Sequence, residues 1–83
     1  NLVVVHQIGS NLDLKLLSIQ LPFAKTEYEP EQFPGLIYRQ EINGREAVCL
    51  IFSSGKCVIT GCASFEDAEE AAETLAETLG DVL

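Results

Sequence analysis

The centre of the chain alternates apolar, strand-length runs with short glycine-containing links, and this pattern restricts the fold more than any other feature. Asn43-Gly44 separates the first two runs, and both of its positions tolerate the positive φ that a two-residue hairpin turn requires. Ser54-Gly55 is predicted to play the same role between the second run and the third. Connections this short join only antiparallel strands. The predicted strands are 35–42, 45–53 and 56–62.

Two more strands and a short helix are predicted before this centre. Residues 2–5 are mostly β-branched and indicate a strand, and residues 26–33 indicate a short strand that runs into a proline-containing turn. Between them, Ser10 followed by Asp13 predicts a helix N-cap with its N3 carboxylate. Pro22 ends this helix, because proline disfavours the α conformation in the residue before it. The apolar positions of the helix are Leu14, Leu17 and Leu21.

The last segment predicts a longer helix. Ser64 and Asp67 form a start resembling a capping box, and Gly80 is expected to end the helix. Its apolar stripe has helical spacing and comprises Phe65, Ala68, Ala72, Leu75 and Leu79. The acidic residues fall mostly off that stripe. One face of the helix is therefore predicted to pack on the sheet while the other forms an acidic, solvated surface.

The element order β-α-β-β-β-β-α predicts a single α+β domain over residues 1–83. Strands grouped with helices on one side give an antiparallel sheet with one covered face. The hydrophobic content of 47% indicates a folded domain. No apolar run approaches the roughly 20 residues of a membrane span, and the start of the chain lacks the features of a secretory signal. An intracellular location and no membrane are the corresponding expectations.

The residues that could support chemistry are few. Cys49, Cys57 and Cys62 are predicted to be small apolar core residues in a reducing compartment, although a disulfide between two of them stays open. Their spacing is not that of a zinc site, so no metal or cofactor is expected. His6 is the only histidine available as a base, and nothing pairs it with a nucleophile. We therefore predict that the chain is not an enzyme.

The uncovered face of the sheet is the predicted location of function. Because side chains alternate along a strand, three sets of residues each point to one face of the sheet. These sets are Val48, Leu50 and Phe52; Lys56, Val58 and Thr60; and Asn1, Val3 and Val5. An uncovered apolar face on a protein domain indicates a partner site. Such a face suits the DNA minor groove, where A·T pairs present only acceptors to asparagine and threonine donors. A surface that binds another protein would have a similar composition, and both interpretations stay open on these residues alone.

Two long motifs give this chain a family resemblance. Residues 28–39 and 50–56, followed by 58–61, resemble the signature segments of archaeal TATA-box-binding proteins, and residues 1–3 and 12–14 resemble the family's first strand and first helix. The similarity covers essentially the whole chain. It implies one repeat, half of the family's saddle: a curved, antiparallel five-stranded sheet with two helices on its convex face.

The resemblance implies a role for each matching residue in binding double-stranded, A·T-rich DNA through the minor groove. Phe33 and Phe52 match intercalating phenylalanines that kink the duplex, with Pro34 beside the first. Asn1 and Thr60 match hydrogen-bond donors to the bases. The apolar floor of the site is matched by Val3, Val48, Leu50 and Val58. Arg39 and Lys56 match residues that contact phosphates. Glu29 and Glu31 match residues that contact transcription factor B.

The resemblance also bears on charge and assembly. The net charge of −8 is concentrated at the C-terminus, because residues 63–83 hold seven of the 13 acidic residues and no basic one. On the convex side those carboxylates would lie away from DNA. The family's saddle contains two repeats, so a homodimer is expected if this chain is complete. The expected location is the archaeal cytoplasm and nucleoid, or the nucleus of a eukaryote.

One alternative function is kept. Single repeats of this fold also occur as accessory nucleic-acid-binding modules of certain ribonucleases H and DNA glycosylases. Such a module need not keep both Phe33 and Phe52, or the acidic pair Glu29 and Glu31. Their presence together favours the transcription factor.

Overall fold

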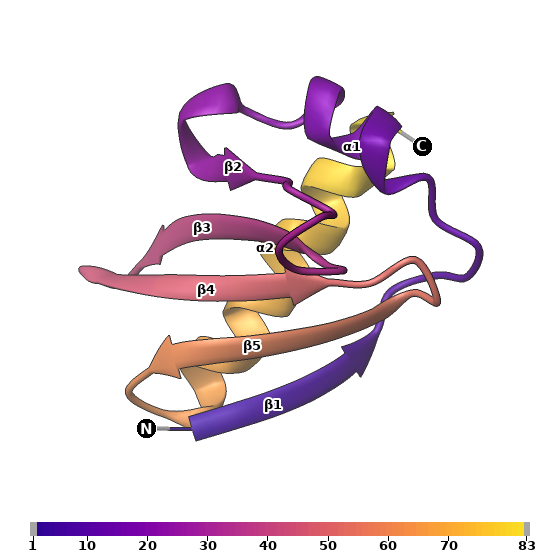
Figure 1. Ribbon diagram of the computed structural model, residues 1–83. Helices are drawn as coiled ribbons and strands as arrows, with labels where there is room; N and C mark the ends of the chain where they lie inside the picture. Colours follow the sequence, from indigo (N-terminus) through magenta and orange to yellow (C-terminus); the bar gives the residue numbers. More distant parts are fainter. Residues whose placement is uncertain (1, 83) are drawn as a thin grey trace.

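The computed structural model describes residues 2–82 and contains one antiparallel sheet, two α-helices and one 3-10 helix (Figure 1). Asn1 lies outside the described residues. The elements in chain order are β1 (Leu2–Gln7), α1 (Leu14–Gln20), η1 (Phe23–Lys25), β2 (Thr26–Glu27), β3 (Leu36–Ile42), β4 (Arg45–Ile51), β5 (Lys56–Cys62) and α2 (Phe65–Val82).

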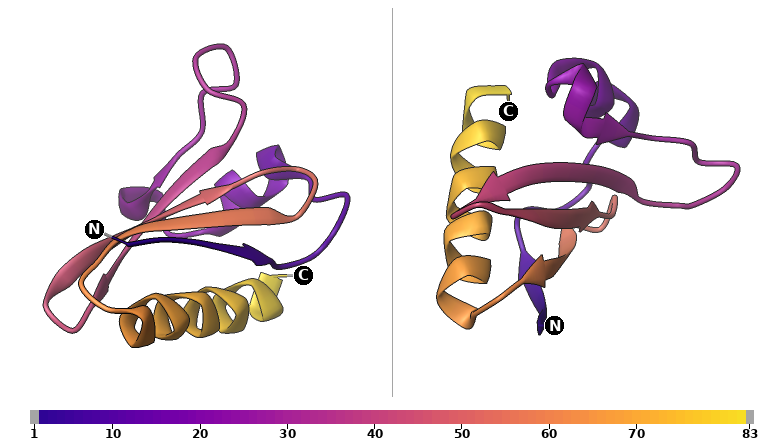
Figure 2. Two further views of the ribbon diagram at one scale, coloured as in Figure 1. Left: turned by 90° about the horizontal axis from the view of Figure 1, so that it is seen from below. Right: turned by 90° about the vertical axis from the view of Figure 1, so that its left-hand side faces the viewer.

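The five strands lie in the order β1-β5-β4-β3-β2, and every neighbouring pair is antiparallel. The predicted α+β class and the predicted order of elements are confirmed. β1 pairs with the distant β5, so it forms one outer edge of the sheet. β2 forms the other edge and is only two residues long, because the rest of the predicted strand 26–33 belongs to a loop that leaves the sheet on the side opposite α2 (Figure 2).

The two tight connections differ from each other. Asn43 and Gly44 have φ angles of 51° and 82°, which confirms the predicted two-residue turn. The prediction of the same turn at Ser54-Gly55 is wrong, because residues 53–55 form a three-residue loop in which the Gly55 amide donates to the Phe52 carbonyl at 2.9 Å. Gly55 has a φ of 94°, and a Cβ there would lie 1.7 Å from the carbonyl oxygen of Gly9.

The helix ends required two corrections. The N-cap of α1 is Asp13 rather than Ser10, since the Asp13 carboxylate accepts the amide of Leu16 at 3.1 Å. The chain before it is instead held to the β4–β5 loop, where the Leu12 amide donates to a loop carbonyl at 2.8 Å. Ser64 caps α2 as predicted, but the helix does not stop at Gly80 and continues to Val82.

Both helices bury their apolar sides in one core on the same face of the sheet. The sheet contributes Leu36, Tyr38, Ile42, Ala47, Cys49, Ile51, Cys57, Ile59 and Cys62, and the helices contribute Leu14, Leu17, Leu21, Ala68, Ala71, Ala72, Leu75 and Leu79. The predicted stripe of α2 is wrong at Phe65, which is 55% exposed, and Ala71 fills the buried face instead. The three cysteines are free and buried in this core, as the apolar interpretation predicted.

Candidate nucleic-acid interface

The sheet face opposite the helices is lined by side chains that alternate with the core residues along each strand. Val3 and Val5 are 64% and 56% exposed, although both are apolar. Their partly buried companions on the inner strands are Ile37, Arg39, Val48, Leu50, Val58 and Thr60. Within the described residues this face carries no helix, which agrees with the predicted uncovered surface (Figure 2).

Strand register aligns these side chains into two rows across four strands. In the first row, Val3 pairs with Thr60, Thr60 with Val48, and Val48 with Arg39. The second row is apolar throughout and comprises Val5, Val58, Leu50 and Ile37. The predicted residues of β1, β4 and β5 are therefore brought together. Ile37 was not among the predicted site residues, although its alternation with Arg39 in β3 could have identified it.

Gly61 in β5 sets the register between β1 and β5. Gly61 has a φ of 85°, and the pairing shifts there so that Leu2 faces Cys62 while Val3 faces Thr60. A Cβ on Gly61 would lie 2.7 Å from the carbonyl oxygen of Glu46. The bulge thus sets which side chains of β1 face the uncovered side.

Phe33 and Phe52 form an aromatic pair at one end of the rows. Their ring centroids lie 5.8 Å apart and the planes meet at 61°, an edge-to-face arrangement. Phe33 comes from the loop between β2 and β3, next to the exposed Pro34, whereas Phe52 directly follows β4. Both rings are partly exposed, so the predicted wedge residues lie at the surface and not in the core.

Gly35 determines how closely the two rings approach the sheet. A Cβ at this position would lie 2.9 Å from the Phe33 ring and 3.1 Å from the Phe52 ring. The Ile51 carbonyl oxygen would lie only 3.2 Å away. Any larger residue would therefore displace the aromatic pair. Gly35 was not predicted as part of the site.

The two predicted phosphate contacts differ in their surroundings. Lys56 is exposed at the start of β5, and among the described residues it makes no ion pair. Arg39 is held by two carboxylates, with Nη1 at 2.5 Å from Glu27 and Nε at 3.9 Å from Glu46. The sequence pattern gave no indication of this pairing, because Glu27 lies on a different strand from Arg39.

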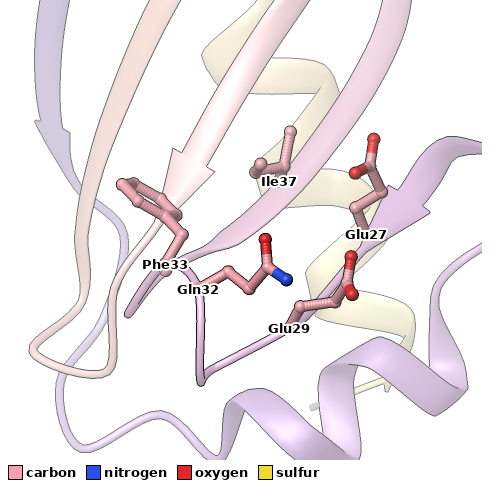
Figure 3. Close-up of a pocket in the computed structure, with 6 residues that line it drawn as sticks. Glu27, Glu29, Gln32, Phe33 and Ile37 are labelled. Carbon is pink, nitrogen blue, oxygen red and sulfur yellow. The ribbon is translucent and has the colours of Figure 1, made fainter.

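A hollow of about 220 Å³ lies beside the aromatic pair, lined by Glu27, Glu29, Gln32, Phe33, Gly35 and Ile37 (Figure 3). Glu29 belongs to this hollow, together with Glu27. Glu31 lines a second, neighbouring hollow with Glu29, Pro30 and Gln32. The carboxylates of Glu29 and Glu31 are therefore exposed on the loop between β2 and β3.

Glu41 and Glu46 pair on the uncovered side of β3 and β4, beyond Arg39, whereas most of the remaining acidic residues of the described chain lie on α2. α2 carries carboxylates in its first turn and along its exposed side, and it crosses the face opposite the two rows (Figure 2). The described residues contain no group of three His, Cys, Asp or Glu side chains placed to hold a metal ion. Over the same part of the chain, no helix is long and apolar enough to cross a membrane.

Comparison with known proteins gives one consistent result. The family model described as transcription factor TFIID, or TATA-binding protein, matches residues 1–82. The TATA-box-binding protein of Haloarcula marismortui is 48% identical over 82 residues, which cover 99% of this chain and 43% of the relative. That of Archaeoglobus fulgidus is 47% identical over 79 residues, covering 95% and 42%.

A solved structure agrees with the sequence relatives. The structure of Methanococcus jannaschii TBP superimposes with a TM-score of 0.87 at 42% identity, covering 98% of this chain and 46% of that chain. The chain thus spans less than half the length of the relatives it matches.

Proposed function

Since the chain belongs to the TATA-box-binding protein family, we propose that it acts as one repeat of a transcription initiation factor and binds A·T-rich promoter DNA through its uncovered sheet face. The observation that carries this proposal is the pair of aligned rows, one wholly apolar and the other with Thr60 between valines. The proposed role is one of binding and not of catalysis, and the proposed location is the archaeal chromosome.

The rows suit the minor groove of A·T pairs. That groove offers the acceptors adenine N3 and thymine O2, and a G·C pair adds the guanine amino donor. The apolar row has no acceptor for that amino group, so a G·C pair loses a hydrogen bond on contact. Thr60 donates its hydroxyl to an acceptor at an A·T pair. Asn1, although outside the described residues, is proposed as the second donor.

The aromatic pair provides the wedge that kinks the duplex. Apolar side chains inserted between base steps unstack them and bend the DNA, and the TATA-box-binding family is itself a well-known example of this behaviour. Phe33 and Phe52 lie at one end of the rows with both rings at the surface. One base step is therefore unstacked at that end, and the bent duplex then contacts the whole width of the sheet. Pro34 restricts the backbone beside the first ring.

Contacts outside the groove complete the proposal. Lys56 and Arg39 neutralise phosphates at the rim, for which Arg39 exchanges Glu27 for a phosphate oxygen. Glu29 and Glu31, exposed on the projecting loop, bind a basic surface of transcription factor B.

The open edge of β1 receives a second repeat. Backbone groups on the outer side of β1 have no strand partner within the described residues, and an edge of this kind pairs readily with another strand. If the chain is complete, we propose that two copies pair as a homodimer through β1. The combined sheet then presents both sets of rows to the DNA.

The test is binding to a TATA-containing duplex and to a G·C-rich duplex over a salt series, with end-to-end energy transfer reporting the kink. We expect tighter binding to the TATA duplex, and loss of both affinity and kink in the double variant Phe33→Ala/Phe52→Ala. Phe65→Ala is the matched control, since Phe65 is exposed but lies on α2. Equal binding to both duplexes, with oligomeric state recorded in the same samples, contradicts the proposal.

A further inference from the structure

The open edge of β1 adjoins a hollow between this strand and α2. β1 is the outer strand of the sheet, and no strand of the described chain pairs with its other side (Figure 1). The hollow has a volume of about 380 Å³, and we call it the β1–α2 hollow. Its lining comes from the end of β1, the residue that follows it and one side of α2: His6, Gln7, Ile8, Glu69, Ala72, Glu73 and Ala76. A strand that pairs with β1 lies about 4.8 Å from it and therefore comes close to this hollow.

Glu69 and Glu73 place negative charge in the hollow that no neighbour neutralises. Both are exposed, and within the described residues neither forms an ion pair. α2 contains no lysine or arginine. His6 lines the same hollow, but its Nε2 atom is buried and has no hydrogen-bond partner in the described chain, so this atom binds neither carboxylate. The β1–α2 hollow therefore presents uncompensated negative charge beside the open edge.

The other carboxylates of α2 point in different directions. Asp67 turns toward the β3–β4 turn, where it accepts a hydrogen bond from Asn43 at 2.7 Å. Glu70 and Glu77 are exposed, but they do not line the β1–α2 hollow. The position of a carboxylate around the helix thus decides whether it lies beside β1.

The same edge also favours pairing with another strand. Backbone groups on the outer side of β1 have no strand partner in the described chain, and unpaired groups of this kind bind a further strand readily. Val3 and Val5 of this strand are 64% and 56% exposed, although both are apolar. Attraction by the strand edge and repulsion by the carboxylates therefore act at one place, and their balance decides whether a partner strand binds.

We propose that ionic strength controls the pairing of two copies through β1. This inference rests on the homodimer included in the proposed function. A pair that uses the same surface on both copies is symmetric about a two-fold axis, so Glu69 and Glu73 of each copy approach one junction on the covered side of the combined sheet. In dilute buffer these carboxylates repel one another, and salt screens them so that the two β1 edges meet.

The size of the effect follows from Coulomb repulsion in water. Each of the two carboxylates on one copy repels each of the two on the other, at roughly 10 Å if the helices lie at the usual packing distance. Together these repulsions weaken the pairing by about tenfold when they are unscreened. The Debye length falls from about 30 Å at 0.01 M salt to about 3 Å at 1 M. Concentrated salt therefore removes nearly all of this repulsion.

The test measures the dissociation constant of the dimer by sedimentation equilibrium without DNA, in potassium chloride from about 0.01 M to about 1 M. The variant is Glu69→Gln/Glu73→Gln, which removes both charges from the hollow. Glu70→Gln/Glu77→Gln is the matched control, because it makes the same change in net charge on the same helix but outside the hollow. Melting temperature and affinity for the TATA and G·C-rich duplexes are measured separately on each protein.

We expect the dimer of the parent protein to tighten by about tenfold over the salt series. Glu69→Gln/Glu73→Gln is already tight in dilute buffer and changes little, whereas the control follows the parent protein more closely. The inference is overturned if the parent protein stays monomeric at every salt concentration, if its dimer does not respond to salt, or if the two variants behave alike. A dimer that responds to salt but does not prefer the TATA duplex contradicts the DNA-binding proposal alone, so the two failures are distinguishable.

Discussion

Glu27→Gln is expected to increase the affinity for DNA, because Glu27 holds the arginine that the proposal assigns to a phosphate. The guanidinium of Arg39 lies 2.5 Å from Glu27, and their side chains are 37% and 53% exposed. An ion pair as exposed as this contributes at most about 1 kcal/mol. The carboxylate must release Arg39 before a phosphate can bind it, so its loss strengthens DNA binding by up to roughly fivefold.

The dependence on salt gives a second measure of the same change. An arginine already neutralised by a carboxylate adds little to the release of counterions from DNA. Once freed, one cation makes the slope of log K against log salt steeper by about 0.9. Anisotropy titrations of a TATA duplex over a salt series give both quantities from the same samples.

Glu46→Gln is the matched control for this experiment. Glu46 also faces Arg39, but its carboxylate oxygen lies 3.9 Å from Nε and its side chain is 66% exposed. We therefore expect a smaller gain in affinity from this substitution. The reasoning is refuted if Glu27→Gln leaves affinity and slope unchanged, or if Glu46→Gln has the larger effect.

Three further predictions test other parts of the structure. Gly35→Ala forces a Cβ against both aromatic rings and a carbonyl oxygen; we expect a loss of about 1–3 kcal/mol in stability by denaturant titration, and a smaller kink by energy transfer. Gly55→Ala combines a positive φ with a clash between the new Cβ and the Gly9 carbonyl, so we expect circular dichroism to show a poorly folded protein. Gly44→Ala is the control, because a Cβ at Gly44 has no atom within 4 Å, and we expect this variant to stay folded. A hydrogen bond with Cys49, and then burial, raise the pKa of the Cys57 thiol above its ordinary 9.0. Above about pH 9 the folded protein therefore keeps a proton that the unfolded chain loses, so the stability of the fold falls as the pH rises. We expect melting curves of Cys57→Val at several pH values to show a smaller decline.

Regular alternation made the sheet predictable from the sequence. From Glu46 to Ile51 in β4 and from Lys56 to Thr60 in β5, core and surface residues alternate, so Val48, Leu50 and Val58 could be assigned to the uncovered face from spacing alone. The turn at Asn43-Gly44 was equally clear, because both residues tolerate positive φ. Local chemistry was sufficient wherever neighbours in sequence decide the structure.

Predictions were weaker where distant segments decide the structure. The residues after β1 form hydrogen bonds with the β4–β5 loop. The helix therefore begins later than predicted, and its N-cap is Asp13 instead of the predicted Ser10. Phe65 matched the helical stripe, yet it sits in the first turn of α2 and remains exposed. The pairing of Arg39 with Glu27 depends on two strands meeting across the sheet, so the order of residues along the chain does not show it.

The arrangement of charge and apolar area explains how so acidic a chain can suit a polyanion. The proposed contact surface holds two cations, and one of them, Arg39, is already neutralised by Glu27 and Glu46. Counterion release therefore supplies little of the affinity, which must come from the apolar rows and from the wedge at Phe33. Those terms depend on the shape and deformability of the duplex, and A·T-rich steps such as TA are easily kinked. Phosphate contacts strengthen binding to every DNA sequence equally, and a surface with few free cations makes few of them. Its affinity for DNA in general is therefore low, and its preference for A·T-rich sequences over others is correspondingly high.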